Sequence, residues 1–232
     1  MTDDRNSGSA GSRWARVEAF RDRGDPDDPA RTRTPCLIVP GLSSSGPDHW
    51  QTLWEHDRAD CRRVETGCWD DPQRDRWVVG LDRAVRAAPG RPILVAHSLG
   101  CLAVAWWAEG IGRDQGDRIG GALLVAPPDV DRANVDPRLQ RFAPTPSAVL
   151  PFPTILVASR NDPYAAIERS RAMADDWGAA FVDAGVKGHL NAQSQLGNWL
   201  IGQRLLDRLI DLAGQPARSA AARPHVQESN HR

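Results

Sequence analysis

Short apolar runs that alternate with stretches of helical pattern constrain the fold of this chain more than any other feature. Three of these runs, at residues 92–96, 121–126 and 154–158, have no polar alternation. Strands that are apolar on both faces are typical of the centre of a parallel sheet covered by helices. Further short runs lie at 36–39, 62–65 and 180–183, the second being weak. The sequence therefore predicts an α/β fold with a mostly parallel central sheet flanked by helices.

Two helices are defined well enough to be given bounds. The first covers 73–88, where Trp77, Val78, Leu81 and Val85 form one apolar face. The Asp-Asp-Pro at 70–72 predicts its start, because an Asp side chain caps free N–H groups and Pro fits the first turn. The second helix is predicted from about 196 to 213.

Length and charge exclude several classes of protein. The 232 residues suffice for one sizeable core, and a net charge of −1 gives no general attraction to nucleic acid or to an anionic membrane. No apolar run approaches the roughly 18 residues of a membrane helix, and the first residues lack the apolar core of a secretory signal. We therefore expect a cytoplasmic protein without a nucleic-acid or membrane partner; a protein partner is left unknown.

The domain is predicted to cover 34–213. Residues 1–33 and 214–232 carry mixed charge and little apolar surface, and both are predicted to be disordered tails. Trp14, Val17 and Phe20 could form a short docking helix. Among the four cysteines there is no C-x-x-C pair, and Cys36 and Cys101 are expected to be buried thiols.

The strand at 92–96 leads into A-H-S-L-G at 96–100 and then into an apolar helix. A strand, a G-x-S-x-G turn and a helix form a nucleophile elbow, here with Ala96 at the first small position. The turn predicts Ser98 as the nucleophile and aims the N–H of Leu99 at the same place. The alternative for Ser98 is a plain helix-capping serine.

Two later strand ends supply the partners that a serine nucleophile needs. Asp162 follows the run at 154–158, and His189 follows the run at 180–183, in the order Ser, acid, His that this fold uses. Each has a simpler alternative: an Asx turn before Pro163 for the aspartate, and an ordinary loop position for the histidine.

The first strand ends in P-G-L-S-S-S-G at 40–46, where a second oxyanion donor belongs. The backbone N–H groups of Leu42 and Leu99 are the predicted pair. The alternative, a phosphate-binding loop, lacks the glycine and lysine patterns of nucleotide sites. His97 is interpreted as structural, and His49 either lines the cleft or holds the loop. The candidate substrate-binding residues are Ser43, His49, Trp69, Pro128 and Tyr164.

Four motifs in order resemble a known family. P-G-L-S-S-S-G-P-D-H-W-Q, A-H-S-L-G, S-R-N-D-P-Y and G-H-L-N-A are similar to the small serine hydrolases of retinoblastoma-binding protein 9 and its bacterial YdeN-like relatives. The resemblance covers about 35–213. It implies a compact α/β-hydrolase with a shortened sheet, no large lid domain and a triad of Ser98, Asp162 and His189. Esterase-like and aminopeptidase-like activities are attributed to the family.

Together these observations predict a serine hydrolase that cleaves an ester or amide of a small substrate through an acyl-enzyme on Ser98. This chemistry requires neither a metal nor an organic cofactor. The alternatives are an acyltransferase or aminopeptidase activity of the same site, or a non-catalytic binding protein on a hydrolase fold.

Overall fold

The computed structural model describes residues 34–214, which form a six-stranded sheet in the order β2-β1-β3-β4-β5-β6. All five strand pairings are parallel, so the predicted fold class is confirmed. The strands are β1 Cys36–Val39, β2 Cys61–Arg63, β3 Ile93–His97, β4 Gly121–Val125, β5 Thr154–Ala158 and β6 Ala180–Asp183. The helices are α1 Trp50–Asp57, α2 Arg74–Ala87, α3 Leu99–Glu109, η2 Arg113–Arg118, α4 Pro137–Gln140, α5 Ile167–Asp176, η3 Ala192–Ser194 and α6 Leu200–Gly214.

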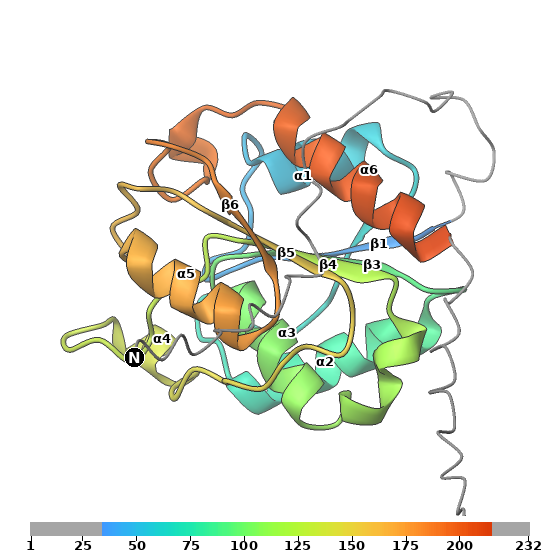
Figure 1. Cartoon of the computed structure of the whole chain (residues 1–232), viewed down its shortest axis with the longest axis horizontal. Coiled ribbons are helices and arrows are strands. Elements are labelled where there is room, and N and C mark those ends of the chain that lie inside the picture. The colour runs from blue at the N-terminus through green and yellow to red at the C-terminus, as the bar shows by residue number, and fades with distance from the viewer. Residues whose placement is uncertain (1–33, 215–232) are drawn as a thin grey trace, which may run out of the picture.

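Helices cover both faces of the sheet (Figure 1). Helices α1 and α6 lie on one face, and α2, α3 and α5 lie on the other. Alternate strand residues point to opposite faces: Cys36 and Ile38 pack with α1 and α6, whereas Leu37 and Val39 pack with α2 and α3. Burial of both strand faces explains why the apolar runs lack polar alternation.

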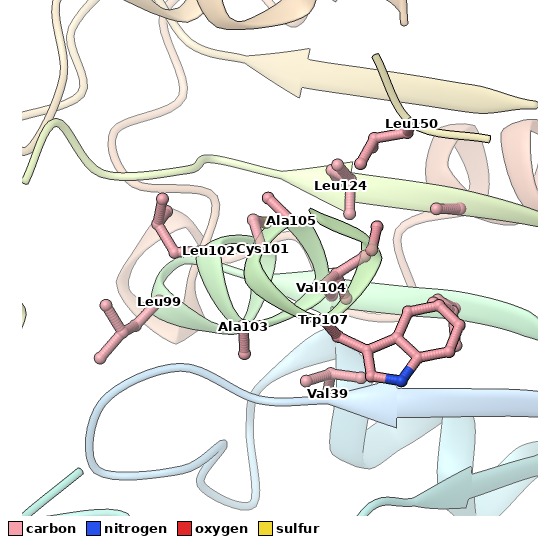
Figure 2. Close-up of a cluster of buried hydrophobic side chains, with 14 of the residues drawn as sticks. Val39, Leu99, Cys101, Leu102, Ala103, Val104, Ala105, Trp107, Leu124 and Leu150 are labelled. Atoms are coloured by element: carbon pink, nitrogen blue, oxygen red, sulfur yellow. The ribbon is translucent and has the colours of Figure 1, made fainter. Parts of the chain in front are cut away.

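Helix α3 is buried along almost its whole length, with only Trp106 and Glu109 partly exposed. Figure 2 shows it enclosed by apolar side chains, with Val39 of β1 and Leu124 of β4 on opposite sides. Trp107 is fully buried, and its indole N–H donates to Asp82 of α2 at 3.1 Å. The helix that follows Ser98 is thus held firmly from several sides.

The order of the strands along the sheet reverses at β1, which lies between β2 and β3. The chain passes from β1 to β2 on one side and returns to β3 on the other, so the loops after β1 and β3 diverge to opposite faces. Such a switch point leaves a crevice at the carboxyl ends of the strands. The loop after β1 and the turn at Ser98 both face this crevice.

Two predicted helix starts are wrong. Helix α2 begins at Arg74, and its N-cap residue Gln73 makes no side-chain hydrogen bond to the helix. Asp71 does not cap the helix because its carboxylate forms an ion pair with Arg141. That pairing lowers the pKa of Asp71. Helix α6 begins at Leu200 rather than near 196, because the preceding backbone has positive φ values, 54° at Gly197 and 39° at Trp199.

Within residues 34–214 every helix is too short or too polar to cross a bilayer. Cys36 and Cys101 are buried thiols, as predicted, and Cys61 is buried as well while Cys68 is exposed. The docking helix predicted around Trp14 and the two predicted tails lie outside the described residues, apart from Gly214, which ends α6.

Candidate active site

Ser98 lies at the sharp turn between β3 and α3. Its backbone has φ 52° and ψ −125°, a conformation that costs on the order of 1–3 kcal/mol for a residue with a side chain. The turn needs Gly100, since a Cβ there would lie 2.3 Å from the carbonyl oxygen of Val39. Ala96 is fully buried and its methyl group is accommodated. The elbow therefore forms despite the missing first glycine.

The structure brings Ser98, His189 and Asp162 together. His189 Nε2 is 2.9 Å from Ser98 Oγ, and His189 Nδ1 is 2.9 Å and 3.0 Å from the two carboxylate oxygens of Asp162. The side chain of Asp162 is only 2% exposed and that of His189 9%. Asp162 also accepts the backbone N–H of Tyr164 at 2.9 Å, so the Asx turn considered for it exists beside the contact with histidine.

The loops that carry Asp162 and His189 are joined to each other. Asn161 Oδ1 accepts the N–H of Gly188 at 2.7 Å, and Ser159 Oγ accepts the N–H of Lys187 at 2.8 Å. Both acceptors precede the aspartate and both donors precede the histidine. These bonds fix the separation of the two loops, which sets the distance between carboxylate and imidazole.

Two aromatic side chains hold the backbone around His189. His97 Nε2 donates to the carbonyl of His189 at 2.9 Å, and the indole N–H of Trp50 donates to the carbonyl of Leu190 at 2.8 Å. His97 is buried, and burial lowers its pKa well below the usual value, so it stays neutral. This contact agrees with the structural role predicted for His97.

The loop after β1 passes close to Ser98. A Cβ on Gly41 would lie 2.7 Å from the Cβ of Ser98, so only glycine lets the loop approach this closely. The N–H of Ser43 donates to the carbonyl of Trp69 at 2.9 Å. Within residues 34–214, the N–H groups of Leu42 and Leu99 donate to no protein acceptor and remain available to a ligand.

Buried polar side chains support this loop from below. Gln51 is fully buried, donates to the carbonyl of Val95 at 3.0 Å and accepts from Ser45 Oγ at 2.7 Å. Arg63 donates to Ser44 Oγ at 3.0 Å and to the carbonyl of Ser45 at 3.2 Å. Its charge is balanced by an ion pair with Glu55. The network ties the loop to the sheet and to α1.

A pocket of about 440 Å³ opens over Ser98 and His189. Three of the predicted substrate-binding residues line it, namely Ser43, His49 and Tyr164, and the Tyr164 ring lies 4.4 Å from that of His189. Trp69 and Pro128 do not line it; Trp69 packs edge-on against Trp77. The remaining lining residues are Leu42, Ser44, Gly46, His97, Arg138, Leu139, Asn191, Ala192 and Gln193.

Helix α4, which the sequence did not predict, contributes Arg138 and Leu139 to this pocket. Asp136 caps that short helix by accepting the N–H of Arg138 at 2.8 Å, and Pro137 occupies its first turn. This is the Asp-Pro helix start that was expected at 71–72. The same signal at 136–137 could have located the helix, but no local pattern shows that the sheet brings it to Ser98.

One cluster within residues 34–214 has the composition of a metal site. The ligand atoms of Cys36, Asp60 and Cys61 lie within 4.8 Å of one another at the opposite end of the strands from Ser98. Asp60 is already paired with Arg58 at 2.8 Å. A hydrogen bond with Cys61 and burial raise the pKa of the Cys36 thiol, which disfavours the thiolate form that binds metals. The cluster is separate from the pocket.

The chain is similar to known proteins in both sequence and fold. A family model described as serine hydrolase matches residues 36–208. A YdeN-like hydrolase of Pectobacterium atrosepticum shares 31% identity, with a TM-score of 0.68 over 79% of this chain and 94% of its own. The ydeN gene product of B. subtilis shares 19% identity, with a TM-score of 0.61 over 77% of this chain and 99% of its own.

More distant structures share the fold alone. One is Est1E of Butyrivibrio proteoclasticus with ferulic acid bound, at 13% identity and a TM-score of 0.56 over 83% of this chain and 94% of its own. A search of curated proteins found no match. The family model covers most of the chain, and the resemblance derived from the four motifs points the same way. The chain therefore belongs to the serine hydrolase family and has the architecture of its YdeN-like members.

Proposed function

We propose that this serine hydrolase is a carboxylesterase in which Ser98, His189 and Asp162 act as a catalytic triad on esters of small molecules. The observation that supports this most directly is the position of the His189 imidazole, 2.9 Å from both Ser98 Oγ and a carboxylate oxygen of Asp162. A capping serine, an Asx aspartate and a loop histidine have no reason to converge in this order.

The chemistry follows from these contacts. His189 Nε2 accepts the Ser98 proton while Oγ attacks the ester carbonyl, and Asp162 holds the proton on Nδ1 and stabilises the imidazolium. The imidazolium then protonates the leaving alkoxide, which departs as alcohol and leaves an acyl-enzyme. Water, activated by His189, adds to the acyl carbonyl, and Ser98 leaves with its proton restored as the acid is released.

The oxyanion of each tetrahedral intermediate is assigned to the N–H groups of Leu42 and Leu99. Neither N–H has another acceptor within residues 34–214, and Leu99 stands at the N-terminus of α3, where the helix dipole is positive. Each such donor contributes about 3–4 kcal/mol to transition-state stabilisation in comparable sites. Ser43, His49 and Tyr164 are assigned to substrate binding because they line the pocket.

The test is covalent labelling together with ester turnover. We expect a fluorophosphonate probe to label the purified protein on Ser98, and Ser98→Ala to abolish labelling and lower the kcat for 4-nitrophenyl acetate by roughly 10⁴–10⁶-fold. Ser147→Ala, at an exposed serine, is the matched control and should change neither. A decrease below tenfold in Ser98→Ala would remove Ser98 from the mechanism. An aminoacyl amide that is cleaved better than any ester would replace the esterase with a peptidase.

A further inference from the structure

His49 has a place in the site that the triad leaves unexplained. It lies between the loop after β1 and helix α1, is only 4% exposed, and lines the same pocket as Ser98 and His189. Its ring centroid is 4.7 Å from that of His97. A buried imidazole beside a nucleophile can act as a base, as a cation or as a neutral donor, and its hydrogen bonds decide which.

One ring nitrogen of His49 is already used in a hydrogen bond that caps a helix. His49 is the N-cap of α1, and its Nδ1 accepts the N–H of Gln51 at 3.1 Å. An accepting Nδ1 carries no proton, so the neutral ring must carry its proton on Nε2. Burial, with the nearby charge of Arg63, lowers the pKa of His49 to about 4, and the ring is therefore neutral at pH 7. His49 can neither serve as a base through Nε2 nor supply a positive charge.

The other nitrogen is a donor without an acceptor. His49 Nε2 is buried and finds no hydrogen-bond partner within residues 34–214. An unpaired buried donor destabilises a structure by about 1–3 kcal/mol, so such groups are usually paired in the functional state. His49 borders the pocket, and a small displacement of the side chains that cover Nε2 would let an acceptor reach it from there: a solvent molecule in the free protein, and a substrate atom once that solvent is displaced.

We propose that His49 Nε2–H selects substrates that carry a second acceptor oxygen besides the scissile carbonyl, and so makes the enzyme specific for short polar esters. A site built to hydrogen-bond an oxygen discriminates against an isostere that lacks it, because the buried donor is then left unpaired. The pocket lining also includes Ser43, Asn191 and Gln193, whose side chains are polar. This inference rests on the ester hydrolysis proposed above.

The experiment compares esters that differ by one ether oxygen. 4-Nitrophenyl methoxyacetate and 4-nitrophenyl butyrate test an acceptor in the acyl chain; 2-methoxyethyl acetate and butyl acetate test one in the leaving group. For each pair the ratio of kcat/KM is divided by the ratio of hydroxide-catalysed rates, which removes intrinsic reactivity. We expect a residual preference of about tenfold for the ether in one pair with the wild-type enzyme.

Two variants distinguish the loss of the Nε2–H donor from the loss of the Nδ1 acceptor that caps helix α1. His49→Asn keeps an N-cap acceptor for Gln51 but has no atom at the Nε2 position, so it should fold normally and lose the tenfold preference. The readout is the ratio of kcat/KM values within each ester pair, which should fall to the hydroxide ratio whatever the absolute activity of the variant. His49→Ala removes both functions and should additionally lower the melting temperature.

A loss of preference in the acyl pair or in the leaving-group pair supports the proposal and locates the oxygen. Equal losses for both members of each pair, or a wild-type preference no larger than that of hydroxide, overturn it. These results leave the proposed function standing, because that function is tested separately by fluorophosphonate labelling, by the turnover of Ser98→Ala and by the comparison of esters with aminoacyl amides.

Discussion

Asp162→Asn is the substitution that most sharply separates catalysis from folding in this site. Asn fits the same buried space, and its Oδ1 can still accept the N–H of Tyr164, which Asp162 accepts at 2.9 Å. Its NH₂ group, however, would face His189 Nδ1, which lies 2.9–3.0 Å from the two carboxylate oxygens. To accept from that group, the imidazole must move its proton to Nε2. Nε2 could then no longer accept the proton of Ser98.

The magnitude follows from losing both the tautomer and the stabilisation of the imidazolium. We expect kcat for 4-nitrophenyl acetate to fall about 10⁴-fold, which corresponds to about 5 kcal/mol of transition-state stabilisation. The assay is initial rate at pH 7.5, with the melting temperature measured in parallel. Nitrogen NMR of labelled histidine should show the proton of His189 on Nε2 rather than Nδ1.

Asp183→Asn is the matched control for this substitution. Asp183 ends β6, pairs with Arg160 at 2.8 Å and lies outside the pocket lining. Its amide variant should retain kcat within about twofold, because it can keep the bond that Asp183 Oδ1 accepts from the N–H of Gly185. The reasoning is refuted if Asp162→Asn retains more than a tenth of the activity while the protein stays folded.

Three further predictions concern the loop, the histidine backbone and pH. Gly41→Ala should lower kcat at least 100-fold with little change in melting temperature, because the new methyl group would displace the Leu42 N–H from Ser98; initial rates and a thermal scan measure both. Trp50→Phe should lower the free energy of unfolding by roughly 2–4 kcal/mol, measured by urea titration, because it leaves the Leu190 carbonyl unpaired and a cavity beside Trp54 and Trp199. Because His49 has a pKa of about 4 when folded against about 6.5 when unfolded, the unfolded chain binds more protons at acidic pH. This stability is complete above pH 6.5 and is lost as pH falls towards 4, by about 2 kcal/mol between pH 7 and 5; urea titrations of His49→Asn should show a smaller decrease.

The sheet was predictable because its central strands β1, β3, β4 and β5 are buried on both faces. The predicted bounds of β1, β5 and β6 agree with the structure; Pro35 and Pro40 border the run at 36–39, and Pro153 precedes the run at 154–158. The bounds of helices were less predictable, because tertiary contacts override local signals. Asp71 could have capped α2, but Arg141, distant in sequence, binds its carboxylate.

The convergence of Ser98, Asp162 and His189 could also be predicted, because parallel strands place the ends of β3, β5 and β6 at one edge of the sheet. The pocket walls were predictable only in part: Ser43, His49 and Tyr164 line the pocket as expected, whereas Trp69 and Pro128 do not. The ring of Trp69 packs against Trp77, and its carbonyl accepts the N–H of Ser43. Arg138 and Leu139 reach the pocket through a connection whose path no periodicity encodes.

Contacts from the first turn of α1 connect several loops of the site. His49 caps that turn beside Ser98, Trp50 holds the loop that carries His189, and Gln51 anchors the loop after β1 to β3. A substitution that removes the contact of Trp50 or of Gln51 will therefore disturb a loop beside Ser98, and laboratory evolution should find few tolerated replacements at these two positions. Substrate range is better broadened at Arg138, which lines the pocket from the short helix α4 and is partly exposed, whereas Leu139 beside it belongs to the buried core.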